Sequence, residues 1–276
     1  MSFSGQLIAY ADDLTLVYHG REATIERQMN EDLIKLNAFS NVYSLVINEK
    51  KTNYTIFNFM KKYKPISVKC GQCTIEETRD LKLLGVTFSG NMKFDVHLEN
   101  ISNQISRKVG LLSRLRHSLD TDVLNKIYKA SIEPVFRYCS AIWSYTYEKP
   151  LEQLVMLQKK AARLIMFQPP DSHSEPLFKH LRWTKIESLW KQNALCVLYR
   201  VKAGKISERV SSWFKLVSRS TRTVQCGQFL AKSSIHSTLY MKTLFHNGIN
   251  DFNDLPIDKI QLENYNLFKS YVKRNV

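Results

Sequence analysis

The sequence predicts an α+β fold, in which a partial antiparallel sheet with one packed helix is followed by a mainly helical, basic region. Short apolar runs on either side of Asp12-Asp13 indicate a β-hairpin, and apolar side chains within residues 21–44 recur at helical spacing. From residue 94 onward, amphipathic helical patterns rich in Lys and Arg replace the strand patterns. A small sheet followed by a run of helices is typical of the α+β class.

The hairpin centres on two adjacent carboxylates. Apolar runs of four to five residues flank Asp12 and Asp13, so we expect two buried strands joined by a turn at Ala11-Asp12. Neighbouring carboxylates repel one another, and a cation relieves that repulsion. Hard oxygen ligands suit Mg²⁺, which proteins bind through one or two carboxylates together with substrate phosphates. The alternative is a hairpin whose tip is acidic without any metal.

One helix and a series of short strands are expected after the hairpin. The apolar stripe of residues 21–44 indicates a helix that packs on the core. Apolar runs bounded by turn residues predict strands at residues 45–52, 54–59, 66–68, 73–75 and 81–88. The segment Cys70-Gly71-Gln72-Cys73 lies between two of these strands. A single CxxC is a weak zinc signal, and its Gly-Gln centre fits a hairpin turn equally well.

Amphipathic helices dominate the rest of the chain. They are predicted at 95–117, from an Asp120 cap to about Tyr138 with a kink or an end at Pro134, and at 150–167. A loop is expected over residues 169–176. Thr184 and Glu187 have capping-box spacing before a helix that reaches Lys202 and closes at Gly204, and a final helix is expected at 264–273. Residues 205–250 are basic and show little period, with Arg219, Arg222, Lys232 and Lys242 among them.

Charge and cysteine usage limit the function classes. The net charge is +15, yet residues 1–60 hold five Lys or Arg and seven Asp or Glu, whereas the remainder holds 35 and 18. An acidic site beside a basic body suits metal chemistry on a nucleic acid. Five cysteines without a secretory start indicate reduced thiols, and no apolar run reaches the roughly 20 residues of a membrane span. We expect a soluble intracellular protein of the nucleus or the cytoplasm, with no membrane partner.

The segment around the Asp pair resembles the metal-binding hairpin in the palm of reverse transcriptases. The match rests on the string Tyr10-Ala11-Asp12-Asp13 and on its apolar flanks, Leu7, Ile8, Leu14 and Leu16. The resemblance implies that Asp12 and Asp13 are catalytic and hold Mg²⁺ or Mn²⁺. It also implies that Tyr10 contacts the primer or its backbone.

Two further segments resemble reverse transcriptase motifs. Leu45, Asn48, Lys51 and Thr52 match the form Leu-x-x-Asn-x-x-Lys-Thr that follows the helix after that hairpin. The resemblance implies that Lys51 assists at the departing pyrophosphate, whereas a solvated Lys-Lys turn is the alternative. Leu84-Gly85-Val86 resembles the segment that contacts the primer end, where glycine lets another backbone approach closely.

The helical region resembles the thumb of non-LTR retrotransposon polymerases of the jockey type. The resemblance rests on Phe94-x-x-His97, on Arg107-x-x-x-Leu111-Leu112-x-x-Leu115-Arg116, on Ile127-Tyr128 and on Tyr138…Trp143. It implies a thumb that holds a duplex backbone in a sequence-independent, salt-sensitive way, although basic residues beside an apolar stripe also occur as a merely solvated face. The basic residues assigned to backbone contact are Arg107, Lys108, Arg114, Arg116, Lys159, Lys160 and Arg163.

The resemblance divides the chain into a partial palm at 1–92, a thumb at 93–168 and a helical, basic C-terminal region at 169–276. The implied partners are an RNA template and a DNA primer or target. Other Asp-Asp polymerases, such as intron maturases, share the hairpin, but the thumb pattern argues against them.

The resemblance also predicts an incomplete enzyme. In this family one essential Asp comes from a strand well upstream of the hairpin, and the chain begins only nine residues before Tyr10. We therefore expect a fragment of an RNA-directed DNA polymerase that is inactive by itself. The alternative is a non-catalytic, basic nucleic-acid-binding module that keeps the hairpin as a scaffold.

Overall fold

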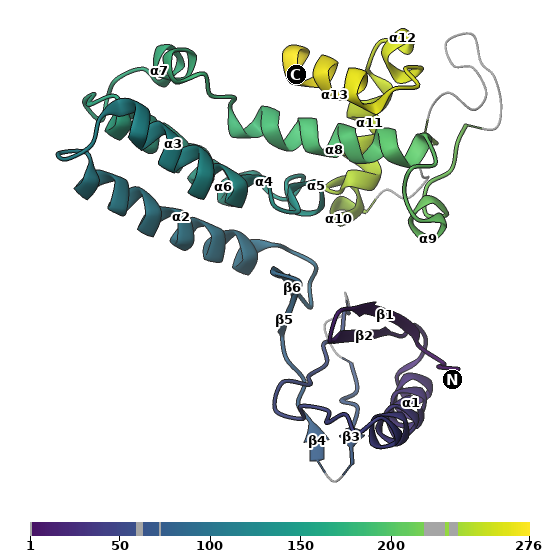
Figure 1. Ribbon diagram of the computed structural model, residues 1–276. Coiled ribbons are helices and arrows are strands. Elements are labelled where there is room, and N and C mark those ends of the chain that lie inside the picture. Colours follow the sequence, from purple (N-terminus) through teal and green to yellow (C-terminus); the bar gives the residue numbers. More distant parts are fainter. Residues whose placement is uncertain (1, 59–62, 72, 218–229, 232–236) are drawn as a thin grey trace. The chain divides into compact units, whose positions relative to one another are not determined.

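The computed structural model describes residues 2–58, 63–71, 73–217, 230–231 and 237–276. The chain divides into two compact units, Met1–Lys93 and Phe94–Val276, whose elements are labelled in Figure 1. Small two-stranded antiparallel sheets lie in the first unit and helices form the second, which agrees with the predicted α+β class. Phe59, Gln72, Arg219, Arg222 and Lys232, which belong to segments singled out in the sequence, lie outside the described residues.

The predicted hairpin is confirmed. Strand β1 (Gln6–Tyr10) pairs antiparallel with β2 (Asp13–Val17), with Tyr10 opposite Asp13, and Ala11 and Asp12 form the turn. The expected burial of its strands is wrong, because side chains such as Ile8 and Leu14 are 43% and 49% exposed. The physical reason is that, in the part of the chain the structure describes, β1 and β2 pair only with each other. Because no other described strand lies beside them, the side chains of this hairpin have few neighbours on the sheet and keep much of their exposure.

Helix α1 (Glu22–Val42) confirms the helix predicted at residues 21–44. Its apolar stripe packs with β3 (Val68–Cys70) and β4 (Cys73–Ile75), which form a second hairpin. The buried residues of this small core are Leu33, Ile66, Val68, Cys70 and Ile75. The helix thus provides the first unit with a core that its three small sheets could not form alone.

Several strand predictions in the first unit are wrong. Residues 45–52 form no strand, since 45–48 are irregular and 49–51 form a turn, and residues 54–58 contribute a single bridge between Tyr54 and Glu77. Residues 66–68 were expected as a strand, but β3 begins only at Val68. The run at 81–88 is two strands, β5 (Asp80–Leu83) and β6 (Val86–Ser89), because the chain reverses at its centre.

The second unit begins with a helical bundle that confirms the predicted helices. Its first elements are α2 (Asp95–Leu115), α3 (Thr121–Ser131), α4 (Glu133–Arg137), α5 (Ser140–Trp143) and α6 (Glu148–Ile165). The Asp120 side chain accepts a hydrogen bond from the Val123 N–H at 2.8 Å, as predicted for a cap. The regular helix ends at Ile132, because Pro134 lies in the first turn of α4 and cannot donate to the preceding turn. Helices α2 and α6 pack side by side (Figure 1).

Two predictions about the following segment need correction. The loop predicted at 169–176 ends at His173, since Ser174–Leu181 form α7. The predicted capping box is also wrong, because α8 (Ile186–Lys202) begins after Lys185 and no side-chain cap bonds its start. Instead Gln158 of α6 accepts a hydrogen bond from the Ile186 N–H at 3.0 Å and donates to the Thr184 carbonyl at 2.9 Å. A tertiary contact therefore takes the place of the local cap.

The predicted end of α8 at Gly204 is confirmed. Gly204 has a φ of +62° and donates to the Val201 carbonyl, while the next residue, Lys205, donates to Arg200. This pair of hydrogen bonds is a Schellman motif, which requires a left-handed residue and therefore favours glycine. The helix consequently stops at the predicted position.

Short helices and one longer helix complete the second unit. They are α9 (Glu208–Ser211), α10 (Thr238–Met241), the π-helix η1 (Leu244–Gly248), α11 (Ile249–Asn253), α12 (Ile257–Ile260) and α13 (Tyr265–Asn275). The last confirms the predicted final helix, with Asn264 as its cap. Phe252 and Phe268 are fully buried against α8. Among the described helices, none has the length and apolar character needed to cross a membrane.

Candidate functional site

The hairpin tip presents two adjacent carboxylates to solvent. Asp12 is the second turn residue and Asp13 the first residue of β2, and both are exposed together with Tyr10, which is 66% exposed. The tight reversal uses a positive φ of 51° at Ala11, a conformation that costs energy for a residue with a Cβ atom. The hairpin therefore places both carboxylates where a cation can reach them.

A buried carboxylate from α1 fixes the base of this hairpin. Asp32 is fully buried and accepts hydrogen bonds from the Gly5 N–H at 2.8 Å, the Ser4 N–H at 3.1 Å and the Tyr18 hydroxyl at 3.2 Å. The Lys35 ammonium lies 2.9 Å from the same carboxylate. Asp32 thus joins the residues that precede β1 and the residue that follows β2 to one point on the helix.

The chemistry of Asp32 follows from these donors. Burial alone raises the pKa of its carboxyl, but the hydrogen bonds from Gly5, Lys35, Ser4 and Tyr18 outweigh burial and hold the pKa below its usual range. Burial and the nearby negative charge raise the pKa of the Tyr18 phenol well above its usual value. Sequence reasoning missed Asp32, although a carboxylate three residues after Met29, on the apolar side of α1, was an available signal.

The hairpin base approaches the Tyr18 ring closely at Gly5. A Cβ atom at Gly5 would lie 2.5 Å from the Tyr18 ring, a distance that real contacts do not show. The absence of a side chain at Gly5 therefore allows the ring to pack over the chain entering β1. This contact and the Asp32 hydrogen bonds position the hairpin together.

The donors at the tip fit part of a metal site. Mg²⁺ binds through one or two carboxylates plus substrate phosphates and water, so Asp12 and Asp13 could supply the protein ligands for one ion. Over the described ranges, no group of three or more His, Cys, Asp or Glu side chains is arranged to hold a metal ion. Among the described residues, no third carboxylate therefore joins Asp12 and Asp13.

The CxxC segment forms a hairpin turn. Cys70 and Cys73 face each other as the last pair of β3 and β4, and Gly71 has the positive φ, 60°, that such a turn uses. Burial, followed by the charge of Glu49, raises the pKa of the Cys70 thiol, which disfavours its reactive thiolate. Among the described residues, no group of three His, Cys, Asp or Glu side chains is arranged to hold a metal, so the turn is the interpretation that the structure supports.

Lys51 lies on a compact turn built by its matched neighbours. The Asn48 carbonyl accepts hydrogen bonds from the N–H groups of Lys51 and Thr52, at 3.1 and 3.0 Å, and from the Thr52 hydroxyl at 2.9 Å. The Asn48 side chain also accepts from the Lys51 N–H at 3.2 Å. Asn48 and Thr52 of the motif therefore shape the backbone and leave the Lys51 side chain in solvent. No described hydrogen bond or ion pair joins Lys51 to the Asp pair.

Leu84 and Gly85 occupy the tip of the β5–β6 hairpin. Both have positive φ angles, 46° and 83°, as a two-residue type I′ turn requires. Gly85 adopts this conformation without strain, while the Leu84 side chain is 41% exposed. The segment assigned to primer contact is thus an exposed turn.

The seven basic residues assigned to backbone contact fall into two groups on and beside α2 and α6. The side chains of Arg107, Arg114 and Lys160 are exposed, and Lys159 is partly exposed. Arg107 donates from its Nε to the Asn103 carbonyl at 3.3 Å, and the other three are also engaged within the chain. Lys108 donates to the Ser131 carbonyl, Arg163 donates to the Ser172 carbonyl, and Arg116 lies over the Phe167 ring.

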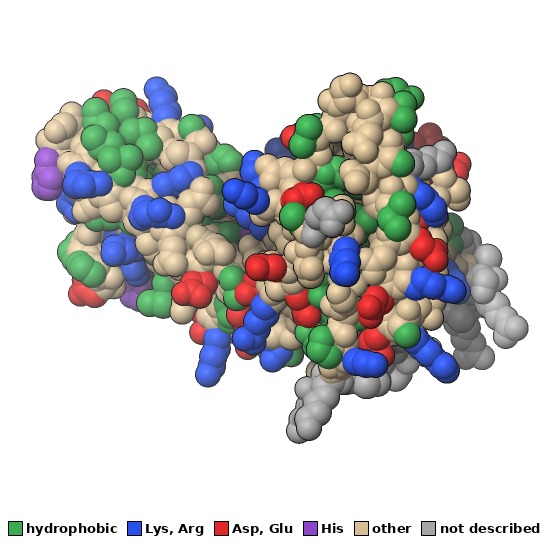
Figure 2. Space-filling model, turned by 90° about the horizontal axis from the view of Figure 1, so that it is seen from below, with side chains coloured by type: hydrophobic (Ala, Val, Ile, Leu, Met, Phe, Trp, Pro, Cys, Tyr) green, Lys and Arg blue, Asp and Glu red, His purple; other side chains and the backbone are tan. Residues whose placement is uncertain are grey.

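Helices α2 and α6 each contain a stretch that has no Asp or Glu. Residues 100–119 and 153–170 contain no Asp or Glu, and they make up much of α2 and α6, which are in contact. Figure 2 shows Lys and Arg side chains spread over the left part of the molecule, where Figure 1 places the end of α2, with few acidic side chains between them. This surface can attract a polyanion over its whole length.

His97, from the thumb-like motif, is a core residue. It is 3% exposed and meets the Trp143 ring edge to face, with the ring centroids 5.9 Å apart. Burial lowers the pKa of His97 to about 4, so the side chain is neutral at physiological pH. The motif residue therefore contributes to packing.

Two transposon proteins of Drosophila melanogaster are similar to this chain. One is described as a probable RNA-directed DNA polymerase from transposon X-element, with 26% identity over 165 residues that cover 58% of this chain and 18% of that protein. The other is described as a probable RNA-directed DNA polymerase from transposon BS, with 24% identity over 189 residues that cover 66% and 20%. The chain thus spans about a fifth of the length of these relatives. No family model and no solved structure matches it.

The similarity agrees with the resemblance carried by the Asp pair and the thumb-like segments. Both relatives are described as probable RNA-directed DNA polymerases from transposons, and each alignment extends over more than half of the chain, well beyond a short motif. The chain is therefore related to the reverse transcriptases of non-LTR transposons.

Proposed function

We propose that this chain is a part of an RNA-directed DNA polymerase from a jockey-like non-LTR transposon. The observation that carries the proposal is the exposed Asp12-Asp13 pair at the tip of a hairpin, in a chain related to such polymerases. In this proposal the first unit belongs to the palm, and the second unit contains the thumb and the C-terminal region. Its partners are an RNA template and a DNA primer or target.

The hairpin tip would hold the catalytic cation. Asp12 and Asp13 would be its ligands, and a bound Mg²⁺ or Mn²⁺ would supply charge stabilisation at the phosphates of the incoming nucleotide. Lys51 would add positive charge at the pyrophosphate, from a turn that Asn48 and Thr52 hold in shape. The Leu84-Gly85 turn would seat the primer end.

The helices of the second unit would bind the backbone of the template–primer duplex. Arg107, Arg114 and Lys160 are exposed on α2 and α6, within stretches that lack carboxylates. Contacts from such residues to phosphates orient a duplex without reading its sequence. Catalysis of phosphoryl transfer depends mainly on positioning and electrostatic stabilisation, so this grip would contribute to rate as well as affinity.

The chain by itself should not extend a primer. Two-metal phosphoryl transfer needs carboxylates that share the metal pair, and the described residues bring no third one to the hairpin tip. We expect no nucleotide incorporation on an RNA template by the chain alone. Incorporation that an Asp12→Ala variant abolishes would overturn this expectation and would direct attention to Asp80 or Asp95 as the completing acid.

A fusion tests the proposed function. The chain would replace the corresponding segment of the X-element polymerase, and nucleotide incorporation on an RNA template would be measured with Mg²⁺. We expect activity from the fusion, a loss of at least a hundredfold with Asp12→Ala, and little change with Asp171→Asn, which removes an exposed carboxylate from a loop of the second unit. Equal activity of the Asp12→Ala and Asp171→Asn fusions would contradict the proposal. A fusion that binds duplex but never incorporates nucleotide would favour a non-catalytic binding module.

A further inference from the structure

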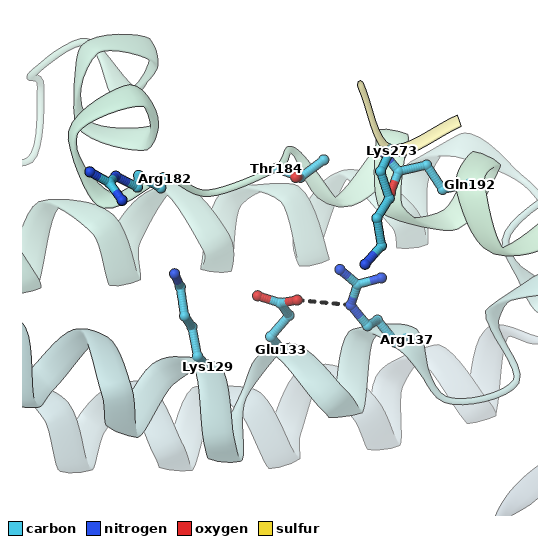
Figure 3. A pocket seen from close by; sticks show the side chains of 7 residues that line it. All are labelled: Lys129, Glu133, Arg137, Arg182, Thr184, Gln192 and Lys273. Carbon is cyan, nitrogen blue, oxygen red and sulfur yellow. Dashed lines mark hydrogen bonds and ion pairs between the residues drawn. The ribbon is translucent and has the colours of Figure 1, made fainter. Parts of the chain in front are cut away.

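A positively charged pocket lies in the second unit, apart from the residues assigned to α2 and α6. It encloses about 340 Å³ and is lined by side chains from α3, α4, α8 and α13 and from the segment after α7 (Figure 3). The charged lining residues are Lys129, Glu133, Arg137, Arg182 and Lys273. Side chains that are far apart in the sequence thus converge on one hollow.

The charges that line this pocket do not balance within the chain. The Arg137 Nε lies 2.8 Å from the Glu133 carboxylate, so this pair neutralises itself (Figure 3). The side chains of Lys129, Arg182 and Lys273 are exposed and enter no ion pair or hydrogen bond with the described residues. Like charges around one hollow repel each other, and an anion placed between them removes that repulsion.

A buried amide provides a second, independent indication of a ligand. Gln192 lines the same pocket and is only 4% exposed, yet its side chain has no hydrogen-bond partner among the described residues. The next residue, Asn193, donates to the Arg137 carbonyl and to the Ser140 hydroxyl, as a half-buried amide usually does. The Gln192 amide is therefore open to the pocket, where a ligand oxygen can accept a hydrogen bond from it.

We propose that this pocket binds a phosphate group of a nucleic-acid strand. Arg182 offers a planar fork of donors that suits phosphate oxygens, and Lys129 and Lys273 add point charges around the same hollow. The Gln192 amide can bond an oxygen of the phosphate or of the adjoining sugar. The anion site follows from the pocket itself, whereas the choice of a strand as the source of the phosphate depends on the proposed function.

Paired charge removals test this site on the full chain. Lys129→Gln with Arg182→Gln removes two pocket charges, and Lys149→Gln with Lys205→Gln removes two exposed charges of the same unit that do not line the pocket. Binding of a labelled 20-nucleotide single-stranded RNA would be measured by fluorescence anisotropy between about 50 and 200 mM salt. We expect the pocket variant to lose at least ten times more affinity than the control variant. Equal losses in the two variants would overturn the proposal, because they would report overall charge alone.

Two further measurements identify the source of the phosphate and exclude unfolding. Thermal melting should give similar midpoints for the pocket variant and the control variant, since all four substituted side chains are exposed. A Gln192→Leu variant changes no charge, and it should also weaken RNA binding. Tripolyphosphate is the free-phosphate probe, titrated against the wild-type chain. If tripolyphosphate bound the pocket but RNA did not, the strand would be the wrong ligand. If RNA binding failed in every form of the chain, the proposed function would fail with it.

Discussion

At the scale of single residues, Asp32 has a structural role that its sequence context barely signals. It is buried with four donors around it, and these donors come from both ends of the hairpin and from α1 itself. Such a carboxylate stabilises the fold only while it is ionised and fully hydrogen-bonded. The position of the Asp pair therefore depends on an acid that takes no part in the proposed chemistry.

Replacing Asp32 by Asn should destabilise the first unit by about 2–3 kcal/mol, because an amide accepts fewer of these hydrogen bonds and its NH₂ group meets other donors. Urea unfolding measures this loss. The matched control is Glu31→Gln, which changes the neighbouring exposed carboxyl group on the same helix. Equal stability of the two variants would contradict the anchoring role of Asp32.

The same residue predicts how stability depends on pH. The pKa of Asp32 is lower in the folded chain than its usual value near 4, so the unfolded chain binds the proton first as the pH falls. The stabilisation is present above that usual value and is lost progressively below it. The Asp32→Asn variant should show a smaller loss of stability than the wild type when unfolding is followed from pH 6 to pH 3.

At the scale of elements, helices were predictable and several strands were not. The apolar stripes of α1, α2, α3 and α6 repeat over several helical turns, so their spacing was enough to identify them as helices. The strands of the first unit are three to five residues long, too short for a period to show. At Leu84 a residue with a bulky side chain adopts a positive φ, which no propensity argument anticipates.

The start of α8 shows why the predicted capping box was wrong. A Thr and a Glu at suitable spacing are common, and local sequence could not reveal that Gln158 reaches the first turn from another helix. Gln158 is 1% exposed and also contacts the Tyr128 hydroxyl at 3.3 Å. Three segments of the second unit therefore depend on one amide.

Gln158→Ala should reduce the stability of the second unit by about 2–3 kcal/mol, since it removes the hydrogen bonds to Ile186 and Thr184 and leaves buried groups unsatisfied. Gln153→Ala, an exposed position on the same helix, is the control. Denaturant unfolding of the two variants gives the comparison. A loss no larger than that of the control would mean that water replaces the amide.

At the scale of the whole molecule, composition predicted that the basic residues lie mainly after residue 60, but not which of them are free to contact a partner. The excess of Lys and Arg after residue 60 pointed to a polyanionic partner, and the structure shows that Lys108, Arg116 and Arg163 are engaged within the chain. The pocket of α3, α4, α8 and α13 escaped sequence reasoning, because its lining residues are spread along the chain from Lys129 to Lys273 and only the fold brings them together. The Asp pair was found because the two carboxylates are adjacent in the sequence.

The basic second unit predicts salt-sensitive binding. Affinity for an RNA–DNA duplex should fall by at least tenfold between about 50 and 200 mM salt, because each phosphate contact releases bound counterions. Anisotropy titrations with two unrelated duplex sequences would measure both the salt slope and the sequence preference. A flat salt response, or a strong preference for one sequence, would argue against the proposed thumb.

The central claim is that the hairpin tip is a cation site, and Mn²⁺ titration of the chain followed by NMR tests it most directly. Paramagnetic Mn²⁺ should broaden the amide signals of Tyr10, Asp12 and Asp13 first. Asp13→Asn should abolish this selective broadening while leaving the metal-free chain at least as stable, since it removes one of two neighbouring negative charges. Glu22→Gln, which removes an exposed carboxylate from the first turn of α1, should leave the broadening unchanged. Broadening that is spread evenly over exposed carboxylates, and that persists in Asp13→Asn, would contradict the claim.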